Sequence, residues 1–285
     1  MPIAINNLSY TYAPGTAFAA NALQNITLSV DDGEFIGIMG QTGCGKSTLI
    51  QLIAGLLTPS SGQILVDGQD INHRSYDRTQ LRRRIGVVFQ QPEHQLFETT
   101  VERDVAFGLR HFGWSSDEIH NAVRQALQAV GFDYEAVRDQ SPLRFSGGEK
   151  RRIAIAGVLA AKPGILILDE PIAGLDPLGR EAFLKLLEQL NQAGTTILMI
   201  SHNADAIANH AKRVLILEQG QLLADGPTEA VFARREFLHD HGLGVSQVRD
   251  VVAMLAQRGF DLPPDTVRYD QLLPQLIALG KEARS

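Results

Sequence analysis

The chain has 285 residues, of which 44% are hydrophobic and 20% are charged, a composition typical of a folded globular protein. Its formal net charge of −6 argues against a general nucleic-acid-binding protein, because such proteins usually carry a basic surface. A single cysteine, Cys44, excludes an internal disulfide framework and a zinc site built from several cysteines, and it fits a reducing cytosol. We expect one large domain, or one domain with an extension.

The sequence gives no sign of a segment that crosses a membrane. No apolar run approaches the length of about 18 residues that a membrane-spanning helix needs. The first ten residues lack a basic segment followed by an apolar one, so no secretory signal is expected. Any role at a membrane is therefore expected to be peripheral, through a protein partner or the membrane surface.

The predicted strands fall into two groups. Ile3–Tyr12 and Leu23–Val30 alternate apolar and polar residues, which is typical of an antiparallel layer with one face in water. Four later runs are continuously apolar, which is typical of parallel strands covered on both faces. These runs are Phe35–Met39, Ile85–Phe89, Ile165–Leu168 and Thr195–Ile200. Together they predict an α/β fold with a mostly parallel core sheet and an antiparallel side sheet.

The stretch between about residues 91 and 162 shows helical spacing and no convincing strand, so we interpret it as an all-helical insertion. Val101–Phe112 and Asp117–Val130 are its predicted helices. Later in the chain, Val214–Leu217 and Leu222–Ala224 flank a short turn and predict a hairpin.

The C-terminal part is polar and helix-prone. Ser246–Arg258 and Tyr269–Leu279 are its predicted helices, separated by a segment with two prolines. We assign residues 3–235 to the α/β domain and residues 236–285 to a small helical C-terminal extension.

A phosphate-binding loop follows the first buried strand. The segment Gly40–Ser47 reads GQTGCGKS and fits G-x-x-x-x-G-K-[ST], with a helical apolar pattern after it. Its glycines let consecutive backbone N–H groups converge on phosphate oxygens at a helix N-terminus. Lys46 can reach the β- and γ-phosphates, Ser47 can coordinate Mg²⁺, and Cys44 is interpreted as a small filler. The expected nucleotide-binding residues here are Gly40, Gln41, Thr42, Gly43, Cys44, Gly45, Lys46, Ser47 and Thr48.

Two acids end the apolar run that begins at Ile165. Asp169 is expected beside the phosphate loop, where it can hold Mg²⁺ through water. Glu170 can accept a proton from the attacking water or orient it. Adjacent acids alone are weak evidence, but the phosphate loop upstream makes the pair a strong indication of a site that hydrolyses ATP.

A second anion-binding device lies about a hundred residues after the first. Ser146-Gly147-Gly148 precedes an apolar helix and leaves backbone donors free at its N-terminus. The basic run Lys150–Arg152 is interpreted as a solvated helix face, with attraction of a partner's phosphates as the alternative. The segment resembles the L-S-G-G-Q signature of ATP-binding-cassette (ABC) proteins, with Phe145 for Leu and Glu149 for Gln.

Further residues of the ABC family appear in the family's order, over roughly residues 3–235. Tyr12 stands where an aromatic residue stacks on adenine, and Gln90 matches the glutamine that contacts Mg²⁺ and the attacking water. The segment ending in Asp176 resembles the loop that crosses the dimer interface, and His202 matches the histidine that contacts the γ-phosphate. The resemblance implies ATP and Mg²⁺ as cofactors. The implied catalytic residues are Glu170, His202, Lys46 and Gln90, and the implied metal-binding residues are Ser47, Gln90 and Asp169.

In this family the signature closes over the ATP that is bound to the partner subunit. The resemblance therefore implies that Ser146, Gly147 and Gly148 act on a partner's nucleotide in a head-to-tail dimer. Soluble cassette proteins of translation typically carry two cassettes, and the ATPases of DNA repair carry long coiled coils or zinc cysteines. This chain has one cassette, one cysteine and no long heptad region, so a transporter ATPase is favoured over both of these non-transport cassettes. An ATPase of another ABC transporter class stays the alternative to the class identified next.

The segments Gln90–Gly108 and Arg151–Ala160 resemble ATPases of energy-coupling factor (ECF) transporters and the related cobalt and nickel importers, most closely the second of two ATPase paralogues. The resemblance implies a sister cassette ATPase, a transmembrane coupling protein and a membrane subunit that captures a vitamin or transition-metal ion. It implies a peripheral location at the cytoplasmic face of the cell membrane. Whether the partner ATPase is a sister chain or a second copy stays open. A docking groove for the coupling protein is predicted at Leu96, Phe97, Val101 and Phe107.

Overall fold

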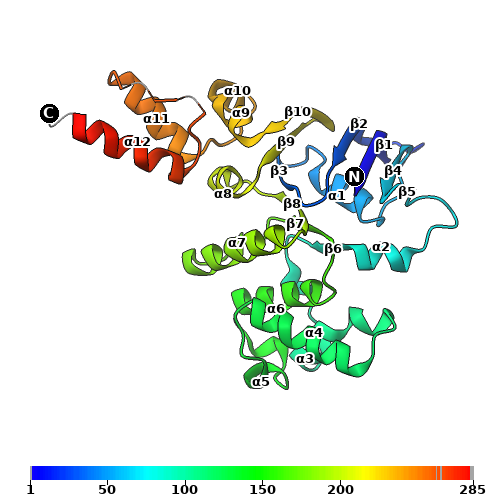
Figure 1. Ribbon diagram of the computed structural model, residues 1–285. Coiled ribbons are helices and arrows are strands. Elements are labelled where there is room, and N and C mark those ends of the chain that lie inside the picture. Colours follow the sequence, from blue (N-terminus) through cyan, green and yellow to red (C-terminus); the bar gives the residue numbers. More distant parts are fainter. Residues whose placement is uncertain (1, 261, 264, 283–285) are drawn as a thin grey trace.

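The structure is a computed structural model that describes residues 2–260, 262–263 and 265–282. A central sheet consists of the strands β3 (Phe35–Met39), β6 (Ile85–Val88), β7 (Ile165–Asp169), β8 (Thr196–Ile200), β9 (Arg213–Glu218) and β10 (Gln221–Pro227). Their spatial order is β10-β9-β3-β8-β7-β6, and only the hairpin of β9 and β10 is antiparallel (Figure 1). The four predicted parallel strands and the predicted hairpin are confirmed.

Successive side chains of the core strands enter two different hydrophobic clusters. In β3, Phe35 and Met39 belong to one cluster, whereas Ile36 and Ile38 belong to the other. The same alternation occurs in β7 and β8. Because side chains of a strand alternate between its faces, both faces of this sheet are covered by apolar groups. This double burial explains why these strands are continuously apolar in sequence.

An antiparallel side sheet covers one face of the central sheet. Its strands are β1 (Ile3–Tyr12), β2 (Ala20–Val30), β4 (Ser61–Val66) and β5 (Gln69–Asp70), in the order β2-β1-β4-β5. The helices α1 (Lys46–Ile53) and α2 (Arg78–Arg84) contribute apolar side chains to the same cluster. The α/β fold with an antiparallel side sheet is therefore confirmed.

Helices fill the segment between β6 and β7 and lie below the sheet in Figure 1. They are α3 (Val101–Ala106), α4 (Ser116–Ala129), α5 (Tyr134–Val137) and α6 (Gly147–Leu159), with the 3-10 turns η1 (Pro92–Gln95), η2 (Gly108–His111) and η3 (Pro142–Arg144). The predicted helix over Val101–Phe112 is wrong in its length, because α3 ends at Ala106 and η2 follows. Gly108 lies at this break, and glycine has a low helix propensity.

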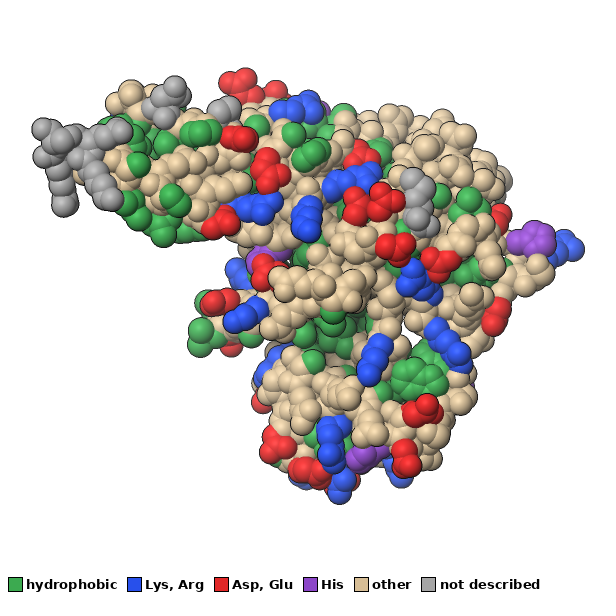
Figure 2. All heavy atoms as spheres, in the orientation of Figure 1, with side chains coloured by type: hydrophobic (Ala, Val, Ile, Leu, Met, Phe, Trp, Pro, Cys, Tyr) green, Lys and Arg blue, Asp and Glu red, His purple; other side chains and the backbone are tan. Residues whose placement is uncertain are grey.

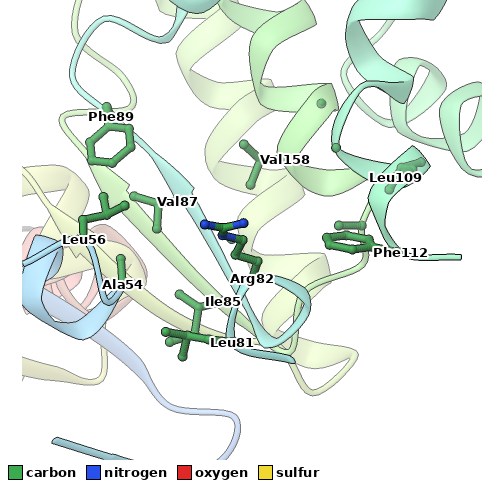
Figure 3. A pocket seen from close by; sticks show the side chains of 14 residues that line it. Ala54, Leu56, Leu81, Arg82, Ile85, Val87, Phe89, Leu109, Phe112 and Val158 are labelled. Atoms are coloured by element: carbon green, nitrogen blue, oxygen red, sulfur yellow. The ribbon is translucent and has the colours of Figure 1, made fainter. Parts of the chain in front are cut away.

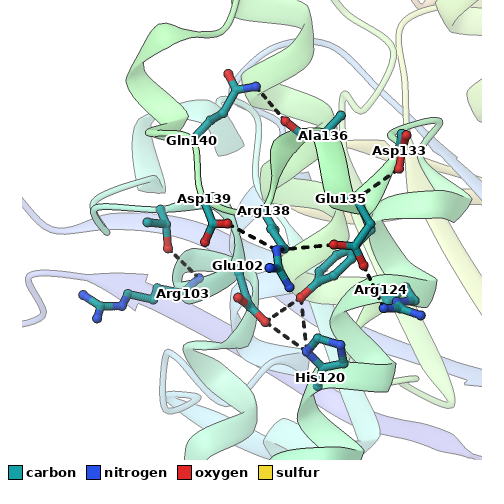
Figure 4. A network of polar contacts seen from close by, with 12 residues as sticks. Glu102, Arg103, His120, Arg124, Asp133, Glu135, Ala136, Arg138, Asp139 and Gln140 are labelled. Atoms are coloured by element: carbon teal, nitrogen blue, oxygen red, sulfur yellow. Dashed lines mark hydrogen bonds and ion pairs between the residues drawn. The ribbon is translucent and has the colours of Figure 1, made fainter.

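A polar network joins three of these helices (Figure 4). The hydroxyl of the buried Tyr134 in α5 donates to Glu102 Oε1 of α3 at 2.6 Å, and His120 Nδ1 of α4 lies 3.2 Å from the same oxygen. Burial and the bond to Glu102 raise the pKa of Tyr134 to about 12. Arg124 and Arg138 lie over its ring at 5.1 and 5.7 Å. The network therefore fixes the helices around one neutral phenol.

The second sheet face is completed by α7 (Pro177–Gln192) and α8 (Ala204–His210), and the chain continues into α9 (Thr228–Ala233), α10 (Arg235–Asp240), α11 (Gln247–Gln257) and α12 (Tyr269–Glu282). Leu238 of α10 still packs in the main core, whereas Val248 and Val252 begin a small separate cluster with Leu272. The division of the chain at residue 236 stays a prediction.

The C-terminal helices lie at one end of the molecule in Figure 1, and apolar side chains are visible on that end in Figure 2. On the face shown in Figure 2, acidic and basic side chains are intermixed. Within the part of the chain that the structure describes, no helix is both long and apolar enough to cross a membrane.

Candidate functional site

The phosphate loop adopts a conformation that only its glycines permit. Gly40, Gly43 and Gly45 have φ values of 152°, 82° and 109°. A Cβ atom on Gly40 would lie 2.4 Å from the carbonyl oxygen of Leu217, and one on Gly45 would lie 2.6 Å from that of Ala22. Side chains at these positions would therefore clash with backbone as well as strain φ. The loop brings its N–H groups to the start of α1, which has no side-chain cap.

Lys46 is the first residue of α1 and is only 7% exposed. Its Nζ donates to the carbonyl oxygens of Gly40 at 2.7 Å and Gln41 at 2.9 Å. Cys44 is buried, with Sγ 3.8 Å from the same Nζ. The ammonium group is thus held inside the loop, where a bound phosphate can replace the carbonyl oxygens as its acceptor.

Two predicted metal ligands that are 122 residues apart in sequence meet at the carboxyl ends of the parallel strands. Ser47 Oγ donates to Asp169 Oδ2 at 3.0 Å. Asp169 is the last residue of β7 and is buried, and Ser47 belongs to the first turn of α1. Ligands of open α/β sheets bind at this edge, so the sheet topology creates the juxtaposition.

Glu170 follows directly and has a positive φ of 50°. Its Oε1 accepts the backbone N–H of His202 at 2.8 Å and lies 3.6 Å from the Nε2 of that ring. The carboxylate is only 13% exposed, whereas the His202 side chain is 55% exposed. Burial raises the pKa of Glu170 above its ordinary value, although His202 opposes the shift. A carboxylate with a raised pKa is a better proton acceptor.

The other predicted contacts lie around this centre. The Tyr12 side chain is 41% exposed, and its hydroxyl lies 3.1 Å from Thr48 Oγ1 next to the phosphate loop. Gln90 is exposed just after β6, and its backbone oxygen accepts a bond from Arg151. The structure therefore brings Tyr12 to the loop, and it records no contact of the Gln90 side chain with Ser47 or Asp169 among the described residues.

The signature residues line a different hollow. Ser146 caps α6, and its hydroxyl and backbone N–H both bond to Glu149. The hollow has a volume of about 490 Å³ and is lined only by residues of α6, the Gly174–Asp176 loop and α7. Asp176 caps α7 by accepting the N–H of Gly179 at 2.6 Å. Within one chain, the phosphate loop and the signature thus belong to separate surfaces.

Arg151 is a residue that the sequence reasoning missed. The prediction of a solvated basic run is wrong for this side chain, which is only 5% exposed. Its guanidinium donates to the carbonyl oxygens of Pro171 at 3.0 Å, Gln90 at 3.3 Å and Glu170. Arg151 therefore ties α6 to the backbone of the carboxylate that follows β7. Only its position early in the signature helix hinted at this role.

The prediction that Val101 lines a docking groove is also wrong. Val101 is fully buried in the core, and Phe97, which is 64% exposed, packs edge to face on Phe107. An apolar groove of about 260 Å³ lies between the end of α1, α2 and β6 on one side and η2 and α6 on the other (Figure 3), and none of the four residues predicted for docking lines it. Its walls include Leu56, Leu81, Val87, Leu109, Phe112 and Val158.

Comparison with known proteins supports an ATP-binding cassette. Residues 23–173 match the family model described as ABC transporter. The energy-coupling factor transporter ATP-binding protein EcfA2 of Symbiobacterium thermophilum is 47% identical over 95% of this chain and 94% of its own length. The protein of the same name from Clostridium perfringens is 44% identical over 98% of each chain.

Similar solved structures are also cassettes of ABC transporters. The structure of cbiO1 from Clostridium perfringens, part of the ABC transporter complex cbiONQ, is 37% identical, with a TM-score of 0.74 over 90% of this chain and 97% of that one. The dimeric cassette MJ0796 bound to ADP and Pi is 29% identical, with a TM-score of 0.71 over 79% of this chain and 98% of that one. The chain therefore belongs to the ABC transporter family, as an ATP-hydrolysing subunit of the energy-coupling factor transporters.

Proposed function

We propose that this chain hydrolyses Mg·ATP at a composite site shared with a second cassette, and that it drives a membrane transporter from the cytoplasmic face. The observation that carries the proposal is the separation of two half-sites. The phosphate loop, Asp169 and Glu170 lie together, whereas Ser146 lines a hollow that contains no residue of the phosphate loop. A head-to-tail pair brings one chain's signature to the other chain's nucleotide.

The residues around Ser47 fit a hard divalent cation. Such cations prefer oxygen ligands, and Ser47 Oγ and Asp169 Oδ2 are 3.0 Å apart. In this proposal Ser47 coordinates Mg²⁺ directly, Asp169 holds it through water, and Gln90 approaches from the strand beside β7. When bound, Mg²⁺ neutralises negative charge that develops on the phosphate oxygens.

Glu170 is proposed to orient the attacking water and to accept its proton. The carboxylate is buried and its pKa is raised, both of which favour proton uptake. Lys46 binds the β- and γ-phosphates, and His202, whose ring is exposed 3.6 Å from Glu170, contacts the γ-phosphate. Thr42, Gly43, Gly147 and Gly148 contribute backbone or side-chain donors at the two half-sites, and Tyr12 stacks on the adenine.

The sister ATPase of an energy-coupling factor transporter is the proposed partner in the pair. The relative EcfA2 is an energy-coupling factor transporter ATP-binding protein, and cbiO1 is part of the ABC transporter complex cbiONQ. A transmembrane coupling protein is proposed to insert a largely apolar helix between α2 and α6, because this groove is lined mainly by aliphatic and aromatic groups, with Arg82 as a charged group among them (Figure 3). A separate membrane subunit captures the transported substrate, so this chain binds at the membrane without contacting the cargo.

The substitution Glu170→Gln tests the catalytic part of the proposal. It removes the proton acceptor and keeps the size and most contacts of the side chain. We expect ATP binding to be retained, a closed ATP-bound dimer to accumulate, and turnover to fall by about a thousandfold. Size-exclusion chromatography with ATP and a steady-state ATPase assay measure these outcomes. Rapid multiple turnover by the variant would contradict the role of Glu170.

A further inference from the structure

The hydroxyl and the backbone N–H of the signature serine, Ser146, already bind a carboxylate from the same helix, that of Glu149. Ser146 Oγ donates to Glu149 Oε2 at 2.7 Å, and the backbone N–H of Ser146 donates to the same oxygen at 2.9 Å. In return, Ser146 Oγ accepts the N–H of Glu149 at 3.4 Å. These bonds from Ser146 lower the pKa of Glu149 below its ordinary value, so the group is a carboxylate at neutral pH.

The arrangement is a capping box, and the chain contains a second one with nearly the same geometry. At the start of α4, Ser115 Oγ and N donate to Glu118 Oε2 at 2.8 and 2.7 Å. That box lies outside the hollow lined by the signature. A capping box also forms with glutamine at the third helical position. The helix therefore does not require a negative charge at residue 149.

The negative charge of Glu149 matters because Ser146 is expected to bind a phosphate of the partner's ATP. Glu149 and Ser146 both line the hollow shared with Asp176, and Ser146 and Asp176 are exposed at the surface. In the proposed composite site, the γ-phosphate of the partner's ATP approaches the N-terminus of α6 and accepts a hydrogen bond from the Ser146 hydroxyl. The hydroxyl proton is committed to Glu149, and the carboxylate repels a phosphate that approaches the same donors.

Resting on the proposed composite site, we propose that Glu149 is a built-in competitor of the partner's γ-phosphate and sets the ATP concentration at which the dimer closes. Closure requires Ser146 to break its bond to Glu149 and turn its hydroxyl to the phosphate. Arg152 lines the same hollow, and its charge already contributes to the lowered pKa of Glu149. It cannot move closer to the carboxylate without loss, because its guanidinium donates to the oxygen of Val130 and lies over Phe132 at 4.6 Å.

The test uses the assembled transporter, which also contains the sister ATPase, and substitutes Glu149 in this chain. Glu149→Gln keeps the capping box and removes the charge, and Glu118→Gln makes the same change in the matched box of α4. We expect Glu149→Gln to lower the ATP concentration for half-maximal ATPase rate by about threefold to tenfold, the size of one partly screened charge contact. The difference from the wild type should shrink as ionic strength rises, because salt screens exposed charges. Glu118→Gln should leave the ATP response unchanged.

The outcomes separate this inference from the function on which it rests. If Ser146→Ala weakens the ATP response while Glu149→Gln stays within twofold of the wild type, the composite site stands and the role of Glu149 is overturned. The same holds if the effect of Glu149→Gln is insensitive to salt or equals that of Glu118→Gln. If Ser146→Ala has no effect, the composite site itself fails, and the inference fails with it.

Discussion

The residue that follows β7 is held in an unfavourable backbone conformation by its neighbours. Glu170 has a φ of 50°, a region that costs a non-glycine residue about 1–2 kcal/mol. Its N–H donates to the Ile200 oxygen at 3.0 Å, its carbonyl accepts from Arg151, and its carboxylate accepts from the N–H of His202. These contacts from three segments over-determine the position of the carboxylate. Such strain is retained where a site needs a preorganised group.

Arg151 should therefore matter for turnover more than for ATP binding. Replacing it by alanine removes the side-chain donor to the carbonyl oxygens of Gln90 and Pro171 and one of the two donors to the Glu170 oxygen, which also accepts the N–H of Ala173 at 3.3 Å. We expect Arg151→Ala to lower the free energy of unfolding by about 2–4 kcal/mol and kcat by about tenfold or more, with a smaller change in KM. Denaturant titration and ATPase kinetics measure these effects. Arg151→Lys should recover only part of kcat, because an ammonium group lacks the fork that reaches several carbonyls.

Lys150→Ala provides the matched control, since Lys150 neighbours Arg151 in the same helix and is less buried. It should leave both kcat and stability close to the wild-type values. A wild-type kcat for a folded Arg151→Ala protein would show that the catalytic carboxylate does not depend on this anchor.

At the scale of elements, the ends of β3, β7 and β8 create the site. Their residues Met39, Asp169 and Ile200 lie at the same edge of the sheet, so the segments that follow them converge. This convergence follows from parallel pairing and could be predicted from three continuously apolar runs. The order of the strands in the sheet could not be predicted, because the apolar pattern of a strand does not indicate which other strands it pairs with.

Elements whose pattern depends on tertiary contacts escaped prediction. β4 (Ser61–Val66) is half exposed and begins with polar residues, so it lacks the run that identified the core strands. The contacts of Arg151 could not be predicted, because it is one of three consecutive basic residues. The sequence indicates that it lies on a helix but not which carbonyl groups it contacts. Ser47 and Asp169 were correctly brought together, since a phosphate loop and a strand end restrict where each can lie.

The groove between α1 and α6 permits a test of docking that leaves the fold intact. Leu56 lines the groove and is 59% exposed, so a charge there is hydrated in the free protein. We expect Leu56→Glu to reduce co-purification with the transmembrane coupling protein by about tenfold or more, because docking would remove apolar contact and desolvate a carboxylate in a groove where Arg82 is its nearest cationic wall residue. Unfolding free energy and ATP binding should change little. Leu223→Glu, at an exposed position of β10, is the control, and equal losses for both variants would contradict docking in the groove.

At the scale of the whole molecule, the C-terminal helices are attached to both sides of the nucleotide site. Gln41 of the phosphate loop donates through Nε2 to the carbonyl oxygen of His241 at 2.9 Å. On the other side, Asp205 Oδ1 accepts the N–H of Gln247 at 2.8 Å. Asp205 lies in the first turn of α8, three residues after His202. We therefore expect any movement of the phosphate loop or of α8 to be felt at residues 241–247.

Asp205 should be the main electrostatic anchor of α11. Its carboxylate accepts one of the free N–H groups at the N-terminus of that helix, where a negative charge also interacts favourably with the helix dipole. The exposed ion pair of Asp250 with Arg235 also joins α11 to α10, but such pairs contribute little. We expect Asp205→Ala to lower the free energy of local opening of α11 by about 1–2 kcal/mol, against at most about 0.5 kcal/mol for Asp250→Ala. Amide hydrogen exchange of residues 247–257 measures this difference. Exchange of α11 that is unchanged in Asp205→Ala would show that apolar packing alone holds the extension to the cassette. An equal rise in both variants would show that Asp205 is not the main anchor, because the exposed pair of Asp250 with Arg235 would then contribute as much.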